Sequence, residues 1–109
     1  MIRYQRAYRD RSVKAVQSVF PDLGREASQR LERTFRDCSA YDFSYLNPQF
    51  SMSSDDPSTA TMRTLSTYTC QPRSAQAAQT VSGQEIFVFR KVGDDWLIES
   101  ALMATPGRK

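Results

Sequence analysis

The chain has 109 residues, a formal net charge of +3, no histidine and two cysteines. Its apolar fraction of 39% and charged fraction of 25% are those of an ordinary globular protein, so we expect one folded domain over residues 1–109 and not a disordered chain. Because histidine is the commonest general base and metal ligand, its absence leads us to expect no metal and no cofactor.

No segment is apolar over a length that could cross a membrane, and the charged N-terminus differs from a signal peptide. We therefore expect a soluble protein, with its compartment left open. Cys38 and Cys70 lack metal-ligand spacing and leave two alternatives, which are a disulfide and two small buried apolar side chains.

The first third of the chain predicts three helices. Residues 2–11 repeat apolar and aromatic side chains at three- and four-residue spacings, as on one face of a helix. Ser12 is a suitable N-cap for a short second helix that ends before Pro21. The third helix is predicted from about Gly24 to Cys38, with one apolar face made of Ala27, Leu31, Phe35 and Cys38.

Arginine carries most of the positive charge and is concentrated in these helices. On the third helix, Glu32 and Arg36 lie four residues apart, and we expect a weak exposed ion pair. No aromatic-interleaved basic motif accompanies the arginines, so we expect a solvated basic layer and no nucleic-acid partner.

From Ser39 onward the apolar period becomes two, which predicts strands. Tyr41 to Tyr45 form a first strand that ends at Asn47-Pro48, and residues 50–53 form a second short extended piece. A turn is expected over residues 54–58, followed by a long strand over residues 59–71. Residues 72–79 are expected to form a polar loop before a strand that begins at Thr80.

The strand that begins at Thr80 continues into a hairpin with apolar residues on both faces. Gly93-Asp94 supplies the tight turn, with glycine where a positive φ is needed. Pairing outward from the turn places Lys91 opposite Trp96, Phe89 opposite Ile98, Phe87 opposite Ser100 and Glu85 opposite Leu102. One face is then aromatic and core-like, with Glu85 as its single acid. The other face resembles a subunit interface, and from it we expect a homodimer through Ile86, Val88, Leu97 and Ala101.

Helices followed by four to five antiparallel strands predict an α+β fold, in which N-terminal helices pack on a curved sheet. The segments 8–12, 19–22 and 87–98 resemble the NTF2-like superfamily, also called cystatin-like or SnoaL-type. The resemblance implies a cone with a cavity between helices and sheet, and frequent dimers. It also implies a bacterial setting and a domain related to a module of a larger protein.

Ketosteroid isomerases and SnoaL cyclases of this superfamily use the cavity, and the isomerases place a carboxylate and a tyrosine in it. The corresponding candidates here are Glu85 or Asp42 as the acid and Tyr4, Tyr8 or Tyr68 as the donor. Asp42 is out of phase with its aromatic neighbours, so it faces outward if they face the core. Glu85 is expected to lie near the open end of its strand, where it is solvated or pairs with an arginine.

We therefore expect a non-enzymatic NTF2-like domain that dimerises and binds a small amphipathic ligand or serves as a protein-association module. Acid–base catalysis in the cavity is the alternative. Trp96 is expected to close one end of the core. The candidate ligand-binding residues are Tyr4, Tyr8, Phe35, Tyr68, Glu85, Phe87, Phe89 and Trp96.

Overall fold

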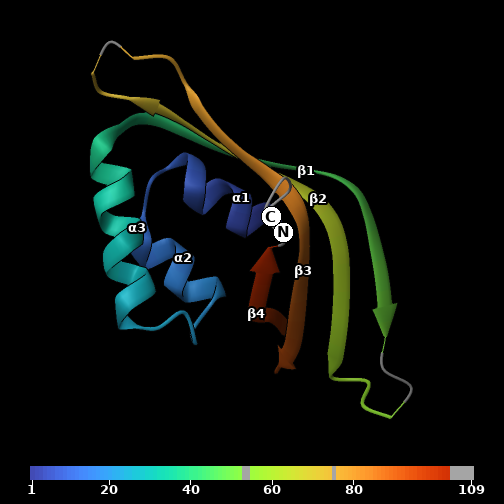
Figure 1. Cartoon of the computed structure of the whole chain (residues 1–109). Helices are drawn as coiled ribbons and strands as arrows, with labels where there is room; N and C mark the ends of the chain where they lie inside the picture. The colour runs from blue at the N-terminus through green and yellow to red at the C-terminus, as the bar shows by residue number, and fades with distance from the viewer. Residues whose placement is uncertain (53–54, 75, 104–109) are drawn as a thin grey trace.

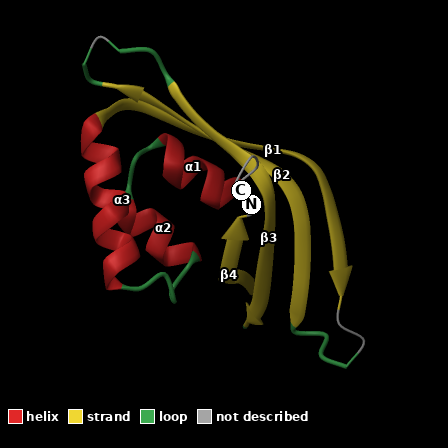
Figure 2. Ribbon diagram, in the orientation of Figure 1, coloured by secondary structure: helices red, strands yellow, loops and turns green. Residues whose placement is uncertain are grey.

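The structure is a computed structural model, and it describes residues 1–52, 55–74 and 76–103. Three helices precede four strands: α1 (Ile2–Arg9), α2 (Val13–Val19), α3 (Arg25–Asp37), β1 (Cys38–Met52), β2 (Thr59–Pro72), β3 (Gln79–Val92) and β4 (Asp95–Met103). The strands form one antiparallel sheet in the order β1-β2-β3-β4. The helices lie against the concave side of this strongly curved sheet (Figures 1 and 2). The predicted α+β layout is confirmed.

The helices begin and end close to the predicted positions. The Ser12 side chain accepts a hydrogen bond of 3.1 Å from the Ala15 N–H, as expected of an N-cap. The first helix ends at Arg9, two residues earlier than predicted, because Arg11 adopts a left-handed φ of 51° in the turn to α2. The expected ion pair between Glu32 and Arg36 is absent from the described residues.

The first strand corrects one prediction. Asn47-Pro48 does not end it, because β1 runs continuously from Cys38 to Met52 across a bulge between Leu46 and Gln49. Asn47 has a φ of 52°, which asparagine tolerates better than most residues, and proline needs no partner for a backbone N–H. Of the predicted extended piece and turn, Ser53 and Ser54 lie outside the described residues.

The hairpin register is correct near the turn and wrong beyond it. Lys91 pairs with Trp96 and Phe89 with Ile98, and Gly93 has a φ of 64°. A bulge at Glu99 then shifts the register by one residue. The strand partners farther out become Phe87 with Ala101 and Glu85 with Met103.

This shift exchanges the faces of the last residues of β4. Ala101 was expected on the outer face, but it packs against the core. Leu102 was expected on the aromatic face, but it is 73% exposed. The extra residue causes both errors, because side chains alternate with a period of two and one insertion inverts the phase.

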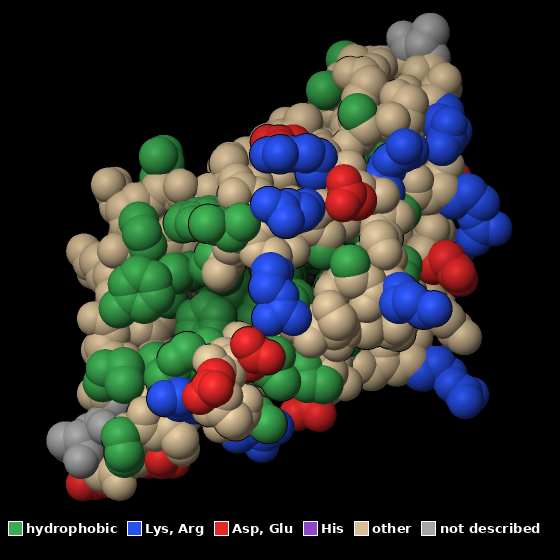
Figure 3. Space-filling view, turned by 180° about the vertical axis from the view of Figure 1, so that it is seen from behind, with side chains coloured by type: hydrophobic (Ala, Val, Ile, Leu, Met, Phe, Trp, Pro, Cys, Tyr) green, Lys and Arg blue, Asp and Glu red, His purple; other side chains and the backbone are tan. Residues whose placement is uncertain are grey.

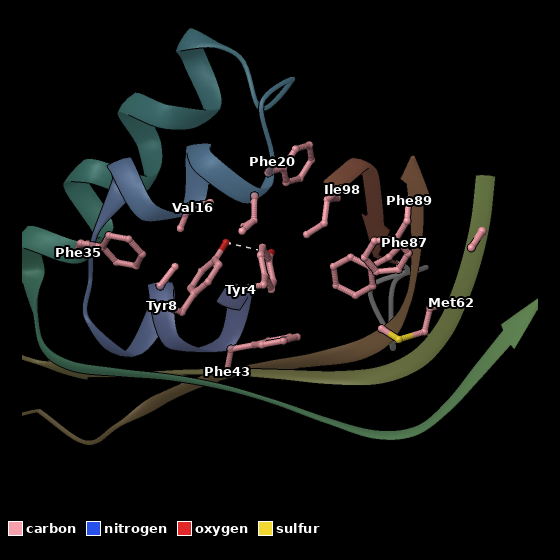
Figure 4. Packing of buried hydrophobic residues seen from close by; sticks show 13 residues of the cluster. Tyr4, Tyr8, Val16, Phe20, Phe35, Phe43, Met62, Phe87, Phe89 and Ile98 are labelled. Carbon is pink, nitrogen blue, oxygen red and sulfur yellow. Dashed lines mark hydrogen bonds between the residues drawn. The ribbon is translucent and has the colours of Figure 1, made fainter. Parts of the chain in front are cut away.

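The core lies between the helices and the nearer half of the concave face. Tyr4 and Tyr8 of α1 contact aromatic side chains of the sheet, and the Tyr4 ring meets Phe43 edge-on at a centroid distance of 5.0 Å. Phe35 of α3 fills the space beside Tyr8, and Phe87 lies on the other side of Tyr4 (Figure 4). Aromatic pairs in this edge-to-face geometry stabilise a core beyond their area burial.

Cys38 and Cys70 form a disulfide, with a Cα–Cα distance of 5.6 Å. Of the two alternatives that the sequence leaves open, the structure therefore shows the cross-link and not two separate apolar side chains. The bond joins the junction of α3 and β1 to the far end of β2, and it closes a loop with a sequence separation of 32 residues.

Replacing both cysteines, as in Cys38→Ser/Cys70→Ser, is expected to lower the free energy of unfolding by roughly 3 kcal/mol, because the unfolded chain regains the entropy of a loop of this length. Urea denaturation of the variant and of the oxidised and reduced protein measures the effect. If oxidised and reduced protein unfold at the same urea concentration, the cross-link does not stabilise this fold.

Candidate functional site

The concave face beyond the helices forms an apolar groove of about 680 Å³. Its walls come from the start of α1, the second half of β1 and the adjoining ends of β2, β3 and β4. Figure 3 shows hydrophobic side chains gathered around this hollow. The groove residues used below are Ile2, Tyr45, Phe50, Met52, Phe89 and Trp96.

Several large apolar side chains of the groove are open to solvent. Ile2 is 66% exposed, Phe50 65%, Met52 57% and Trp96 38%. The floor is buried by comparison, with Phe89 at 8%. Scattered exposed apolar residues are normal, but a contiguous concave cluster marks a binding surface.

Deeper in the cone, behind the groove, four polar side chains form a hydrogen-bonded chain. The Tyr68 hydroxyl donates to the Glu85 carboxyl at 2.8 Å. The hydroxyls of Tyr4 and Tyr68 are 3.1 Å apart, and those of Tyr4 and Tyr8 are 3.2 Å apart. The chain therefore connects α1 to β2 and β3 through side chains, and it ends on a carboxyl group; we call it the tyrosine–glutamate chain.

Glu85 is 5% exposed, and burial raises its carboxyl pKa above 4.5. The hydrogen bond from Tyr68 opposes this shift and lowers the pKa. The Ser66 hydroxyl oxygen on β2 is buried without a hydrogen bond of ordinary geometry to any described residue. No arginine or lysine forms an ion pair with Glu85 within the described ranges.

The expected environment of Glu85 is therefore wrong. It is neither solvated nor paired with an arginine, because it lies on a part of β3 that α1 covers. The tyrosine hydroxyls share its environment, and burial raises the pKa of Tyr4, Tyr8 and Tyr68. All three phenols are therefore protonated at neutral pH.

The structure divides the predicted ligand-binding residues into separate groups. Tyr4, Tyr8, Tyr68 and Glu85 meet in the tyrosine–glutamate chain, whereas Phe89 and Trp96 line the groove. Phe35 packs beside Tyr8 at the opposite end of the core, away from the groove (Figure 4). Phe87 is fully buried between the two groups.

The structure also bears on the predictions for Asp42 and Trp96. Asp42 is exposed, as its phase predicts, so it does not join Glu85. Trp96 does not close the core, because it forms one wall of an open groove. Beside it, Asp95 lies 3.9 Å from Arg3 across the groove rim, and no cluster of potential metal ligands occurs in the described parts of the chain.

Sequence reasoning did not identify Ile2, Tyr45, Phe50 or Met52 as groove residues. The bulge at Asn47 and Pro48 explains two of these omissions, because it turns Phe50 and Met52 onto the same face as Tyr45. The available signal was the run of large apolar residues at 43, 45, 50 and 52, which changes phase at Asn47-Pro48.

Comparison with known proteins supports the fold. No protein-family model and no curated protein sequence matches the chain. A proposed scytalone dehydratase from Novosphingobium aromaticivorans has a TM-score of 0.83 at 14% identity, over 96% of this chain and 78% of that one. A proposed aromatic ring hydroxylase from the same organism has a TM-score of 0.80 at 20% identity, over 99% and 85%.

A third solved structure is an NTF2-like superfamily protein from Salmonella enterica serovar Typhimurium, with a TM-score of 0.76 at 14% identity over 98% of this chain and 86% of that one. The chain therefore has the NTF2-like fold, as its sequence predicts. Identities of 20% and below define the fold and leave the activity open. In the described part of the chain, no helix is long and apolar enough to cross a membrane.

Glu85→Gln is expected to remove a pH dependence of stability. Because the folded-state pKa of Glu85 is raised, its contribution is greatest below the ordinary value of 4.5 and is lost as pH rises through the folded pKa. The free energy of unfolding of the wild type should therefore fall relative to that of Glu85→Gln as pH increases above 4.5. Urea denaturation across this range measures the difference.

Glu26→Gln is the matched control, since Glu26 is exposed on α3 and has no ion-pair partner among the described residues. This variant should not reproduce the fall in relative free energy of unfolding that Glu85→Gln shows above pH 4.5. A constant difference for Glu85→Gln would show that Glu85 titrates as an ordinary exposed acid.

Proposed function

We propose that this domain is a non-enzymatic binding domain that holds a small amphipathic molecule in the apolar groove and forms a homodimer through its outer sheet face. The observation that carries the proposal is the exposure of Phe50, Met52 and Ile2 around one hollow. Covering these side chains would remove apolar surface from water, which favours binding at about 25 cal/mol per Å² before the costs of association.

The groove has the size and chemistry of a ligand site. Its volume of about 680 Å³ is within the usual range for small-molecule pockets. Tyr45 and Trp96 each combine an apolar ring with a hydrogen-bond donor, and the Arg3–Asp95 pair adds charge at the rim. This combination favours a molecule with an apolar body and one polar end.

The position of Glu85 supports binding over catalysis. Along β3, Glu85 is followed on the same face by Phe87 and then Phe89, and only Phe89 lines the groove. A ligand in the groove would therefore meet Phe89 and would be separated from Glu85 by Phe87. The carboxyl already accepts a hydrogen bond from Tyr68, which is a structural use for the group.

Acid–base catalysis is the second candidate, and one observation favours it. A buried carboxyl with a raised pKa lies 2.8 Å from a tyrosine hydroxyl, which is a pairing suited to proton transfer. This function requires Tyr4 or Phe87 to move aside. A groove ligand that shifts the ¹³C resonance of the Glu85 carboxyl would favour catalysis, and an unchanged resonance would favour binding alone.

The dimer proposal rests on the outer face of the sheet. Leu46, Leu65 and Leu102 are 62%, 39% and 73% exposed there, and neighbouring aliphatic residues are half-buried. The proposed interface consists of Leu46, Leu65, Ile86, Val88, Leu97 and Leu102. Leu102 takes the place expected for Ala101, which faces the core. An aliphatic surface with a charged fringe is typical of an interface between identical subunits.

Phe50→Asp is expected to weaken binding of a neutral apolar probe, N-phenyl-1-naphthylamine, by about tenfold, because a charge replaces a ring whose burial is worth roughly 1.5–3 kcal/mol. The probe's fluorescence measures binding. Trp96 is the single tryptophan of the chain and lines the groove, so its emission should shift to shorter wavelength on binding.

Val81→Asp is the control for this experiment. Val81 is 54% exposed, but it lies neither in the groove nor in the proposed interface. Equal loss in both variants, or probe binding without a change in Trp96 emission, would place the probe elsewhere.

Leu102→Asp is expected to convert the dimer into a folded monomer. An aspartate in the aliphatic interface would have to be buried without a partner, whereas in the monomer it would be solvated. Light scattering gives the mass, and circular dichroism tests the fold. Phe50→Asp should remain dimeric, and a monomeric wild-type protein would contradict the interface directly.

A further inference from the structure

We propose that the domain has a second binding site, for a small molecule carrying a phosphate or diphosphate group, in a basic groove at the disulfide end of the cone. This basic groove lies between the turn from α1 to α2, the last turns of α3 and the segment after β2, and it has a volume of about 730 Å³. Its charged residues are Arg11, Lys14, Arg36, Arg73, Asp10 and Glu32.

The four cations come from three separate parts of the chain. Arg11 and Lys14 belong to the α1–α2 region, Arg36 to α3, and Arg73 follows β2. Against two acids, they leave an excess of two positive charges around one hollow. None of these six side chains forms an ion pair within 4.0 Å in the described ranges, so no cation of the groove is engaged in a direct ion pair there.

Two of the arginines are held in place by backbone carbonyls. Arg11 donates from Nη1 to the Cys38 carbonyl at 2.7 Å, and Arg73 donates from Nε to the Arg36 carbonyl at 2.6 Å. Each guanidinium keeps further N–H groups for another acceptor, because arginine has five. Such fixed donors lose little side-chain entropy on binding an anion.

The backbone at Arg11 is unusual. Its φ of 51° lies in the left-handed region, where glycine is preferred and a side chain is penalised by about 1 kcal/mol or more. This conformation directs the Arg11 side chain toward the start of β1, where it reaches Cys38. The strained backbone at Arg11 thus places its guanidinium beside the other cations of the basic groove.

The disulfide fixes the remaining geometry. Arg36 precedes Cys38 by two residues and Arg73 follows Cys70 by three. The Cys38–Cys70 bond therefore joins the two segments that present these arginines, and the Arg73 N–H also donates to the Asp37 carbonyl at 3.0 Å. Figure 1 shows the end of α3, the start of β1 and the end of β2 converging at this end of the molecule.

A phosphate-bearing ligand suits this arrangement better than a monocarboxylate. Guanidinium groups bind phosphate oxygens in a two-pronged geometry, and four cations around one hollow match the several charges of a diphosphate. The basic groove and the apolar groove involve different residues, so this proposal does not rest on the proposed function.

Calorimetric titration with inorganic pyrophosphate tests the site. The titration is done at about 150 mM salt, because interactions between exposed charges are then screened beyond about 8 Å. We expect saturable binding to the wild type and a weakening of about tenfold in Lys14→Gln/Arg36→Gln, as expected for the loss of charge-assisted hydrogen bonds. Arg30→Gln/Arg33→Gln is the matched control, because it removes the same charge from exposed positions of α3 outside the basic groove.

The control variant should change the affinity for pyrophosphate by no more than about twofold. Arg30 and Arg33 do not line the basic groove, and salt screens their long-range interaction with the bound anion. Equal weakening in the two double variants, or no saturable binding to the wild type, would overturn the proposal. Amide resonances of the wild type give an independent readout during the same titration. Shifts confined to residues 10–14, 32–36 and 73 support the site, and shifts centred elsewhere overturn it.

Discussion

The structure depends on a mismatch between long strands and short helices. β1 has 15 residues and extends about 50 Å at about 3.3 Å per residue, whereas α1 has 8 residues and extends about 12 Å. The helices therefore cover only one part of the concave face (Figure 2). An aromatic core forms under them, and the uncovered apolar face becomes the groove. The candidate ligand site is thus a direct consequence of element length.

The tyrosine–glutamate chain lies under the covered part. A buried carboxyl without partners would cost several kcal/mol, and the hydrogen bond from Tyr68 reduces that cost. Tyr4 extends the connection to α1, so the polar atoms hold the helix to the sheet where the aromatic rings also meet. The tyrosine–glutamate chain therefore helps to fix the packing of α1 on the sheet, whether or not a ligand reaches Glu85.

The sequence predicted the helices, the antiparallel strands that follow them and the turn at Gly93, because each has a local periodic or conformational signal. The bulges could not be predicted in the same way, since Glu99 is chemically ordinary and its insertion is visible only in the pairing of two strands. The burial of Glu85 was missed for a related reason. Whether a strand position is buried depends on the length of α1 and on where α1 packs on the sheet. The alternation of side chains along a strand carries no information about either.

β2 connects the apolar groove, the tyrosine–glutamate chain and the disulfide. Its concave-face side chains run from Ala60 beside the groove, through Thr64 and Tyr68, to Cys70 in the disulfide. All these side chains lie on the same face of β2. The pairing of β2 with β3 is regular throughout. A register shift in β2 would therefore disturb the groove, the tyrosine–glutamate chain and the disulfide together. The bulges lie instead between β1 and β2 and between β3 and β4, where β1 and β4 take up the curvature of the sheet and the β2–β3 pairing stays regular.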